Sequence, residues 1–140
     1  MPVAWCLASP KLGEREVAAG LLAHAASTGA LRPGLTLIGD KGLAGRDFEN
    51  LVTTGYGLRL IRPDRKDEPR RHGSIGWIRQ WIESVNDTLK GQLGLEQHGG
   101  RTTGGVYTRI TQRLLAMVTC IWHNWATAEP ARRSLTAYDH

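Results

Sequence analysis

The segment Leu35-Thr-Leu-Ile-Gly39 decides the fold class of this chain, because it is an almost uninterrupted apolar run that is followed at once by Asp40. Such a run is typical of a strand that is buried on both faces of a parallel sheet. The turn residues Arg32-Pro-Gly34 stand before it and separate it from the preceding segment. We therefore predict a central strand that ends at Asp40.

Helices and strands are predicted to alternate around this run. Residues 2–8 are short and apolar and predict a strand, whereas residues 13–27 carry apolar side chains at helical spacing. Beyond Asp40, residues 46–53 predict a second helix and residues 56–61 a further strand. This order indicates parallel strands joined by right-handed crossovers, an α/β arrangement. Functional residues of such sheets lie just past the carboxyl ends of the strands, which is the position of Asp40.

The second half of the chain predicts two long helices. Residues 77–90 carry a broad apolar stripe at spacings of three and four, and a second helix is indicated from Gly104 or Gly105 to Trp125. Residues 64–74 have no apolar side to bury and predict an exposed basic loop. We expect one domain over residues 1–126, followed by a loosely ordered tail over residues 127–140.

The charge of the chain is unevenly distributed. The 140 residues include 18 Lys plus Arg and 13 Asp plus Glu, which gives a formal net charge of +5. The first 55 residues are balanced, so all of the excess lies in the second part. Its densest basic cluster consists of Arg59, Arg62, Arg65, Lys66, Arg70 and Arg71. This cluster could neutralise the phosphates of a nucleic acid, and the alternative is a solvated loop of mixed charge.

The cysteines and the apolar runs bear on the compartment. Cys6 and Cys120 follow no metal or redox spacing, which fits a reducing cytoplasm. No secretory signal is visible, and no apolar run approaches the roughly 20 residues that a bilayer requires. We expect a cytoplasmic protein without a membrane partner.

Asp40 and Glu83 are the candidate metal ligands. Arg79, Glu83 and Lys90 share one face of the predicted helix, and Asp87 lies one turn beyond Glu83. A carboxylate at the mouth of a parallel sheet and another on a helix packed across it can converge on Mg²⁺, which prefers hard oxygen ligands. Two alternatives stay open: an ordinary polar helix face laced with ion pairs, and a helix N-cap or turn role for Asp40.

The chain resembles bacterial insertion-sequence transposases of the DDE class, which have an RNase H-like fold. In that family the second catalytic Asp stands in an apolar strand before a Lys-Gly-Tyr type turn, and the third acid lies in a Tyr-x2-Arg-x3-Glu-x6-Lys signature. Asp40 matches the second acid and Glu83 the third, and Arg79 and Lys90 match the basic positions of the signature.

Two positions depart from the family pattern, since Leu43 and Gly76 stand where the family has Tyr. The resemblance implies a partial RNase H-like fold, a mixed sheet with flanking helices, that lacks the first strands and the first catalytic Asp. It also implies Mg-dependent phosphodiester cleavage and strand transfer during DNA transposition. Asp40 and Glu83 would be the catalytic, metal-binding acids of a two-magnesium site, while Arg79 and Lys90 would contact phosphates or orient Glu83.

The implied partners are double-stranded DNA at the transposon ends and a second copy in a homo-oligomer, with the basic cluster helping to hold the DNA. The only acids ahead of Asp40, Glu14 and Glu16, lie on the first predicted helix and are not expected to reach the sheet mouth. With the first Asp absent, we expect the isolated chain to bind Mg²⁺ poorly and not to cut DNA. The alternative function is a non-catalytic DNA-binding or dimerising fragment, an inactive gene relic.

Overall fold

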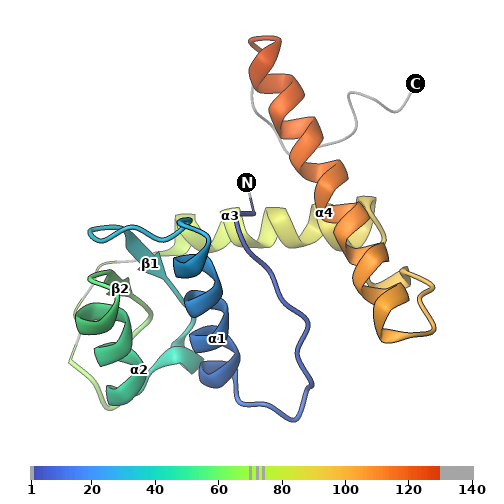
Figure 1. Ribbon diagram of the computed structural model, residues 1–140. Helices are drawn as coiled ribbons and strands as arrows, with labels where there is room; N and C mark the ends of the chain where they lie inside the picture. The colour runs from blue at the N-terminus through green and yellow to red at the C-terminus, as the bar shows by residue number, and fades with distance from the viewer. Residues whose placement is uncertain (1, 70, 72, 74, 130–140) are drawn as a thin grey trace. The chain divides into compact units, whose positions relative to one another are not determined.

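The computed structural model describes residues 2–69, 71, 73 and 75–129, with the side chain of Arg79 excepted (Figure 1). The chain divides into two compact units. The α/β unit is Val3–Ile75, and the helical unit begins at Gly76 and includes Pro2. The domain expected over residues 1–126 therefore consists of two units. Most of the tail expected over residues 127–140 lies outside the described residues.

The α/β unit confirms two predicted helices and two predicted parallel strands. Its elements are α1 (Glu14–Ser27), β1 (Thr36–Ile38), the 3₁₀ turn η1 (Lys41–Leu43), α2 (Arg46–Asn50), the π-helical turn η2 (Leu51–Gly55) and β2 (Arg59–Ile61). The strands run parallel, with Leu37 of β1 opposite Leu60 of β2. This mixture of helix and parallel strand agrees with the α/β class that the sequence predicts.

The core of the α/β unit lies on the side of the sheet to which Leu37 and Leu60 belong. These two side chains pack against four buried residues from α1, α2, η2 and the loop before β2, namely Leu22, Phe48, Val52 and Leu58. Leu35 remains 48% exposed, however, and Thr36 is also exposed. Within β1, Leu37 and Ile38 belong to opposite faces and both are half-buried, whereas Thr36 is exposed, so the predicted burial on both faces is confirmed only in part.

Residues 2–8 form no strand in the described chain. Val3 is 73% exposed, and Leu7 is also exposed. A strand needs a neighbour that satisfies its backbone N–H and C=O groups, and the described sheet consists of β1 and β2 alone. The predicted strand is wrong, because apolar composition indicates a strand only where a pairing partner exists.

The helical unit contains both long helices that the sequence predicts. Its elements are α3 (Gly76–Asp87), the π-helical turn η3 (Thr88–Gln92), the 3₁₀ turn η4 (Leu95–Gln97) and α4 (Thr103–Ala126). Thr102 caps α4, since its hydroxyl oxygen accepts a hydrogen bond from the Gly105 amide at 3.1 Å. This cap satisfies one of the free amides at the helix start and explains why α4 begins at Thr103.

The apolar stripe of α3 includes exposed aromatic side chains. Trp77 and Trp81 are 61% and 63% exposed, and their rings meet edge to face with centroids 6.0 Å apart. The stripe that identifies this helix in the sequence is thus not covered along its whole length. None of the described helices is both long enough and apolar enough to cross a membrane.

Candidate functional site

Asp40 lies two residues beyond Ile38, the last residue of β1, and caps the following turn. Its Oδ1 accepts a hydrogen bond from the Gly42 amide at 2.5 Å, and its carbonyl accepts one from the Leu43 amide. The N-cap role that the sequence left open is therefore confirmed. The carboxylate is exposed, and no described residue donates to its second oxygen. Asp40 can bind a cation through Oδ2 while Oδ1 keeps the turn in place.

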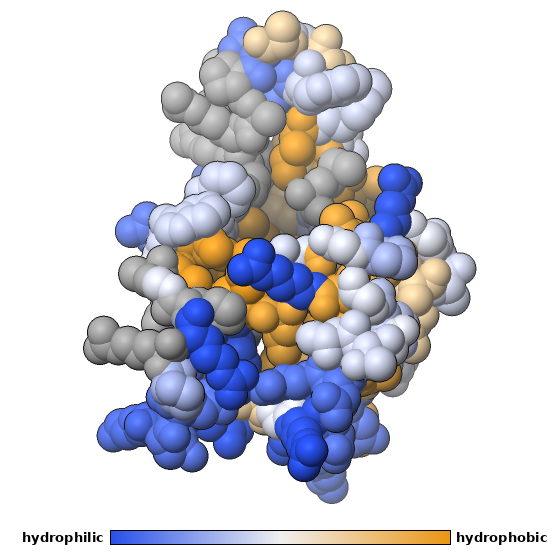
Figure 2. Space-filling model, turned by 90° about the vertical axis from the view of Figure 1, so that its left-hand side faces the viewer, coloured by the Kyte–Doolittle hydropathy of each residue, from blue (hydrophilic) through white to orange (hydrophobic). Residues whose placement is uncertain are grey.

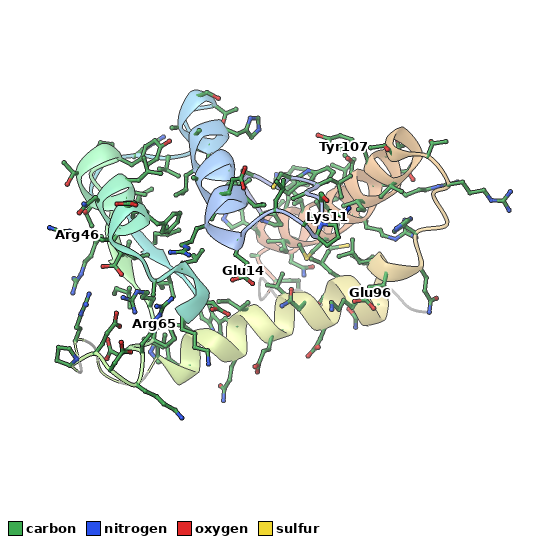
Figure 3. The ribbon with its side chains drawn as sticks, turned by 90° about the horizontal axis from the view of Figure 1, so that it is seen from below. Lys11, Glu14, Arg46, Arg65, Glu96 and Tyr107 are labelled. Atoms are coloured by element: carbon green, nitrogen blue, oxygen red, sulfur yellow. The ribbon has the colours of Figure 1, made fainter. Side chains whose placement is uncertain are left out.

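Glu14, the first residue of α1, reaches the same turn (Figure 3). A Cβ atom on Gly42 would collide with Glu14 Oε2 and would lie 3.3 Å from Asp40 Oδ1, so both carboxylates flank this glycine. The expectation that Glu14 stays away from the sheet mouth is wrong. The reason is tertiary, because the first turn of α1 packs against η1.

Two arginines hold the loop that follows Asp40. Arg15 Nη1 and Arg65 Nη2 both donate to the carbonyl of Ala44, at 3.3 and 3.2 Å. Ala44 is almost fully buried, so a buried carbonyl receives two charged donors. These contacts place two guanidinium groups at the loop that carries the Asp40 cap.

The predicted basic cluster separates into exposed members and one buried member. Arg62 is only 5% exposed, whereas the described remainder of the cluster is exposed: Arg59, Arg65, Lys66 and Arg71. Arg70 lies outside the described residues. Figure 2 shows hydrophilic side chains gathered over the lower part of the face on which α2 and the segment after β2 lie. Among these cations, Arg59 and Lys66 have no side-chain partner in the described part of the chain and are available to a polyanion, and Arg65 keeps donors beyond the one that it gives to Ala44.

Arg62 is held between two carboxylates of the same unit. Its Nε donates to Glu49 Oε1 at 3.0 Å, and its Nη1 and Nη2 donate to the two oxygens of Glu68 at 2.7 and 2.8 Å. Arg71 lies beside both acids, with its guanidinium nitrogens 3.5 Å from Glu49 Oε2 and 3.8 Å from Glu68 Oε1. We call Arg62, Glu49 and Glu68 the clasp.

The ion pairs of the clasp shift the pKa values of its members. Hydrogen bonds from Arg62 hold the pKa of the Glu68 carboxyl at about 2, and the Arg65 amide lowers it further in the same direction. The pKa of Glu49 is lowered as well, chiefly by its hydrogen bond from Arg62. The pKa of Arg62 is raised, above all by the Glu68 carboxylate. All three groups are charged at neutral pH.

Glu83 lies exposed on α3, beside an open hollow of about 440 Å³. The hollow is lined by one face of α3 and η3: Gln80, Glu83, Ser84, Asp87, Thr88 and Gln92. Asp87 thus shares a face with Glu83, as the helical spacing predicts. Arg79 lies within α3, and its side chain is outside the described part of the chain.

Lys90 pairs with an acid that the sequence did not single out. Its Nζ lies 2.7 Å from Glu96 Oε1, on the η4 turn (Figure 3), and this bond raises the pKa of Lys90. The predicted face of Arg79, Glu83 and Lys90 assumes regular α-helical spacing. That assumption fails beyond Asp87, because η3 is a π-helical turn with a different angular step.

The structure brings the carboxylates of Asp40 and Glu14 together at Gly42. It also brings Arg62 and Arg71 to the same carboxylate, that of Glu49. Asp40 and Glu83, in contrast, belong to different units. No group of three or more metal-ligating side chains occurs among the residues described. Searches against protein-family models, curated proteins and solved structures find no match to this chain.

Sequence reasoning missed Glu14, Glu49 and Glu68. Glu68 carried a weak signal, because it follows Arg65 by three residues within a basic stretch. Glu49 and Glu14 carried none, since their partners lie 13 or more residues away in the chain.

Proposed function

We propose that this chain acts on DNA as part of a DDE-class transposase with an RNase H-like fold, using Asp40 and Glu83 as acidic ligands of Mg²⁺. The observation that carries the proposal is the place of Asp40. Its exposed carboxylate lies two residues beyond the carboxyl end of the first of two parallel strands. The carboxyl ends of parallel strands are where α/β proteins place their reactive groups.

The donor groups at this position suit a hard divalent cation. Asp40 retains one oxygen free of its cap, and the Glu14 carboxylate flanks the same glycine. Mg²⁺ takes one or two protein carboxylates and fills its remaining positions with water and phosphate oxygens. Within the α/β unit, Glu14 therefore joins Asp40 in the proposed ligand set.

The bound metal would supply activation of the attacking hydroxyl and stabilisation of the leaving oxygen in phosphodiester cleavage. The chain itself would hold the carboxylates in place through the Asp40 cap and through the two arginines at Ala44. Arg79 and Lys90 are proposed to contact phosphates or to orient Glu83.

The exposed cations of the α/β unit support DNA binding. Arg59, Arg65 and Lys66 are exposed, and each phosphate that they neutralise releases a counterion. The affinity for duplex DNA should therefore fall steeply with salt. A fluorescence anisotropy titration of the full chain at several salt concentrations tests this directly, and an affinity that is indifferent to salt would contradict it.

The metal site is tested by NMR with Mn²⁺ as the probe, because weak binding is visible there. Mn²⁺ should broaden the amide signals of Lys41 and Gly42 in the wild-type chain, and Asp40→Asn and Glu14→Gln should each reduce the broadening. Glu16→Gln is the matched control, because Glu16 lies in the same first turn of α1. Equal broadening in the wild type and in Asp40→Asn would overturn the site.

The second candidate is a non-catalytic DNA-binding or dimerising chain. It is favoured by the cap at Asp40, which gives this acid a structural role without any metal. In a chain of that kind, the single variants Asp40→Asn and Glu83→Gln should each bind duplex DNA with the same affinity as Asp47→Asn, which changes the net charge by the same amount. A metal response at Asp40 and Glu83 would instead support the transposase proposal.

A further inference from the structure

Every donor of the Arg62 guanidinium has an acceptor within the α/β unit. Nε donates to Glu49, Nη1 donates to Glu68 and to the Pro63 carbonyl, and Nη2 donates to both carboxylates. A guanidinium has five N–H donors, and these five contacts use them all. Arg62 therefore has no donor left for a phosphate, although it belongs to the basic cluster.

The two carboxylates of the clasp each bind a second part of the unit. Glu68 Oε2 also accepts from the Arg65 amide at 3.0 Å, which closes the segment between Arg62 and Glu68 into a turn. Glu49 Oε1 also accepts from the Gly45 amide at the start of α2. The clasp therefore ties this segment to α2.

We infer that Arg62 is a positioning residue, and that the clasp holds residues 63–68 in the conformation that presents Arg65 and Lys66 to the phosphates of DNA. The inference rests on the DNA binding proposed above and refines it. The exposed cations would contact DNA, and the buried arginine would fix where they lie.

Two physical arguments favour a role of the clasp in ordering residues 63–68 over a direct contact with the DNA phosphates. Ordering a flexible basic segment at the moment of binding costs affinity, so a segment that is ordered beforehand binds more tightly. A planar guanidinium can serve two carboxylates at once, which the point charge of a lysine cannot do. The role of Arg62 in the clasp thus depends on the planar shape of its guanidinium as well as on its charge.

The clasp and simple electrostatics predict opposite effects for one substitution. Glu68→Gln makes the chain more positive by one charge, so electrostatic attraction alone would tighten DNA binding. If the clasp orders the segment, Glu68→Gln should instead weaken duplex binding by about threefold to tenfold, the scale expected for ordering a few side chains.

Asp67→Asn is the matched control. Asp67 is the neighbouring exposed acid, and it lies outside the clasp, so its substitution adds the same charge and leaves the clasp intact. This variant should bind DNA more tightly than the wild type. Hydrogen exchange reports the order of the segment without DNA: protection of the Arg65 amide should persist in Asp67→Asn and should be reduced in Glu68→Gln.

Arg62→Lys provides a second test that keeps the net charge. A direct phosphate contact would largely survive this change, whereas the clasp should fail and the affinity should fall by about threefold to tenfold. Tighter binding by Glu68→Gln, equal to that of Asp67→Asn, would overturn the inference while leaving the proposed function standing. A wild-type chain that does not bind duplex DNA at low salt would overturn the proposed function itself.

Discussion

Arg113 Nε on α4 donates to the carbonyl of Leu93 at 2.8 Å, directly after the π-helical turn η3. The same guanidinium reaches the carbonyls of Gly94 and Gln97. The last carbonyls of a helix lack partners within it, so Arg113 satisfies groups that would otherwise need water. This one side chain links α4 to the end of η3 and to η4.

Arg113→Met should destabilise the helical unit by about 1–3 kcal/mol, because several charge-assisted hydrogen bonds are lost together. Urea unfolding followed by tryptophan fluorescence measures this effect, since the unit contains several tryptophans. Arg109→Met is the control, because Arg109 is exposed and its guanidinium makes one long hydrogen bond to Gln112. Equal losses for the two variants would show that Arg113 has no special role.

The cap and the proposed metal role of Asp40 can be separated by two substitutions. Asp40→Ala should cost about 1 kcal/mol of stability, because the Gly42 amide loses its acceptor. Asp40→Asn should keep most of that stability, since asparagine caps as well as aspartate does, while it weakens the Mn²⁺ response. Urea titrations of the two variants, followed by circular dichroism, distinguish the roles. Equal stability of Asp40→Ala and the wild type would contradict the cap.

The clasp should make stability depend on pH in the acid range. The pKa of Glu68 is lowered from 4.5 to about 2 in the folded chain, so the folded state binds fewer protons than the unfolded state between these values. The stabilisation is therefore fully present above pH 4.5 and is lost as the pH falls toward 2. Urea unfolding midpoints of the wild type should decrease over this window.

The double variant Glu49→Gln/Glu68→Gln should start from a lower midpoint at neutral pH and should decrease less on acidification. Both acids have lowered pKa values, so removing both removes this source of the pH dependence. If the double variant and the wild type followed parallel curves, the clasp would not be the origin of the acid sensitivity.

Phe48→Ala should destabilise the α/β unit by about 3–5 kcal/mol, because this ring lies in the core with Leu22 and Val52. Leu35→Ala removes an apolar side chain of the same unit that is about half exposed, and it should cost only about 1 kcal/mol. Chemical denaturation of both variants checks the difference. A similar cost for the two would place the core elsewhere.

Local patterns predicted the helices well. The stripes of α1, α3 and α4 and the run that forms β1 each lie within a short stretch of sequence, so neighbouring residues suffice to identify them. The parallel pairing of β1 with β2 also followed from the order of the elements. The predictions that failed are those that depend on a partner distant in the sequence. Residues 2–8, for example, have the composition of a strand but pair with neither strand of the described sheet.

Parts of the candidate site could not be predicted for the same reason. The sequence placed Asp40 at the end of a strand, and it raised the cap as an alternative. It did not indicate that Glu14 flanks the same glycine, or that Lys90 pairs with Glu96 across a π-helical turn. It also counted Arg62 with the DNA-binding cations, although its neighbours in sequence say nothing of Glu49, which lies 13 residues earlier.

The sequence by itself determined the helices, the two parallel strands, the place of Asp40 and the excess of positive charge, because each depends on composition or on spacing within one segment. Only the tertiary structure decided which charges are exposed and which are paired. A charge is neutralised by whatever lies within a few ångströms in space, and the packing of α1 against η1 and of α2 against the segment after β2 sets those distances. For this reason Arg62 and Lys66 are two cations of one basic cluster in the sequence, whereas in the folded chain Arg62 is buried and paired and Lys66 is exposed.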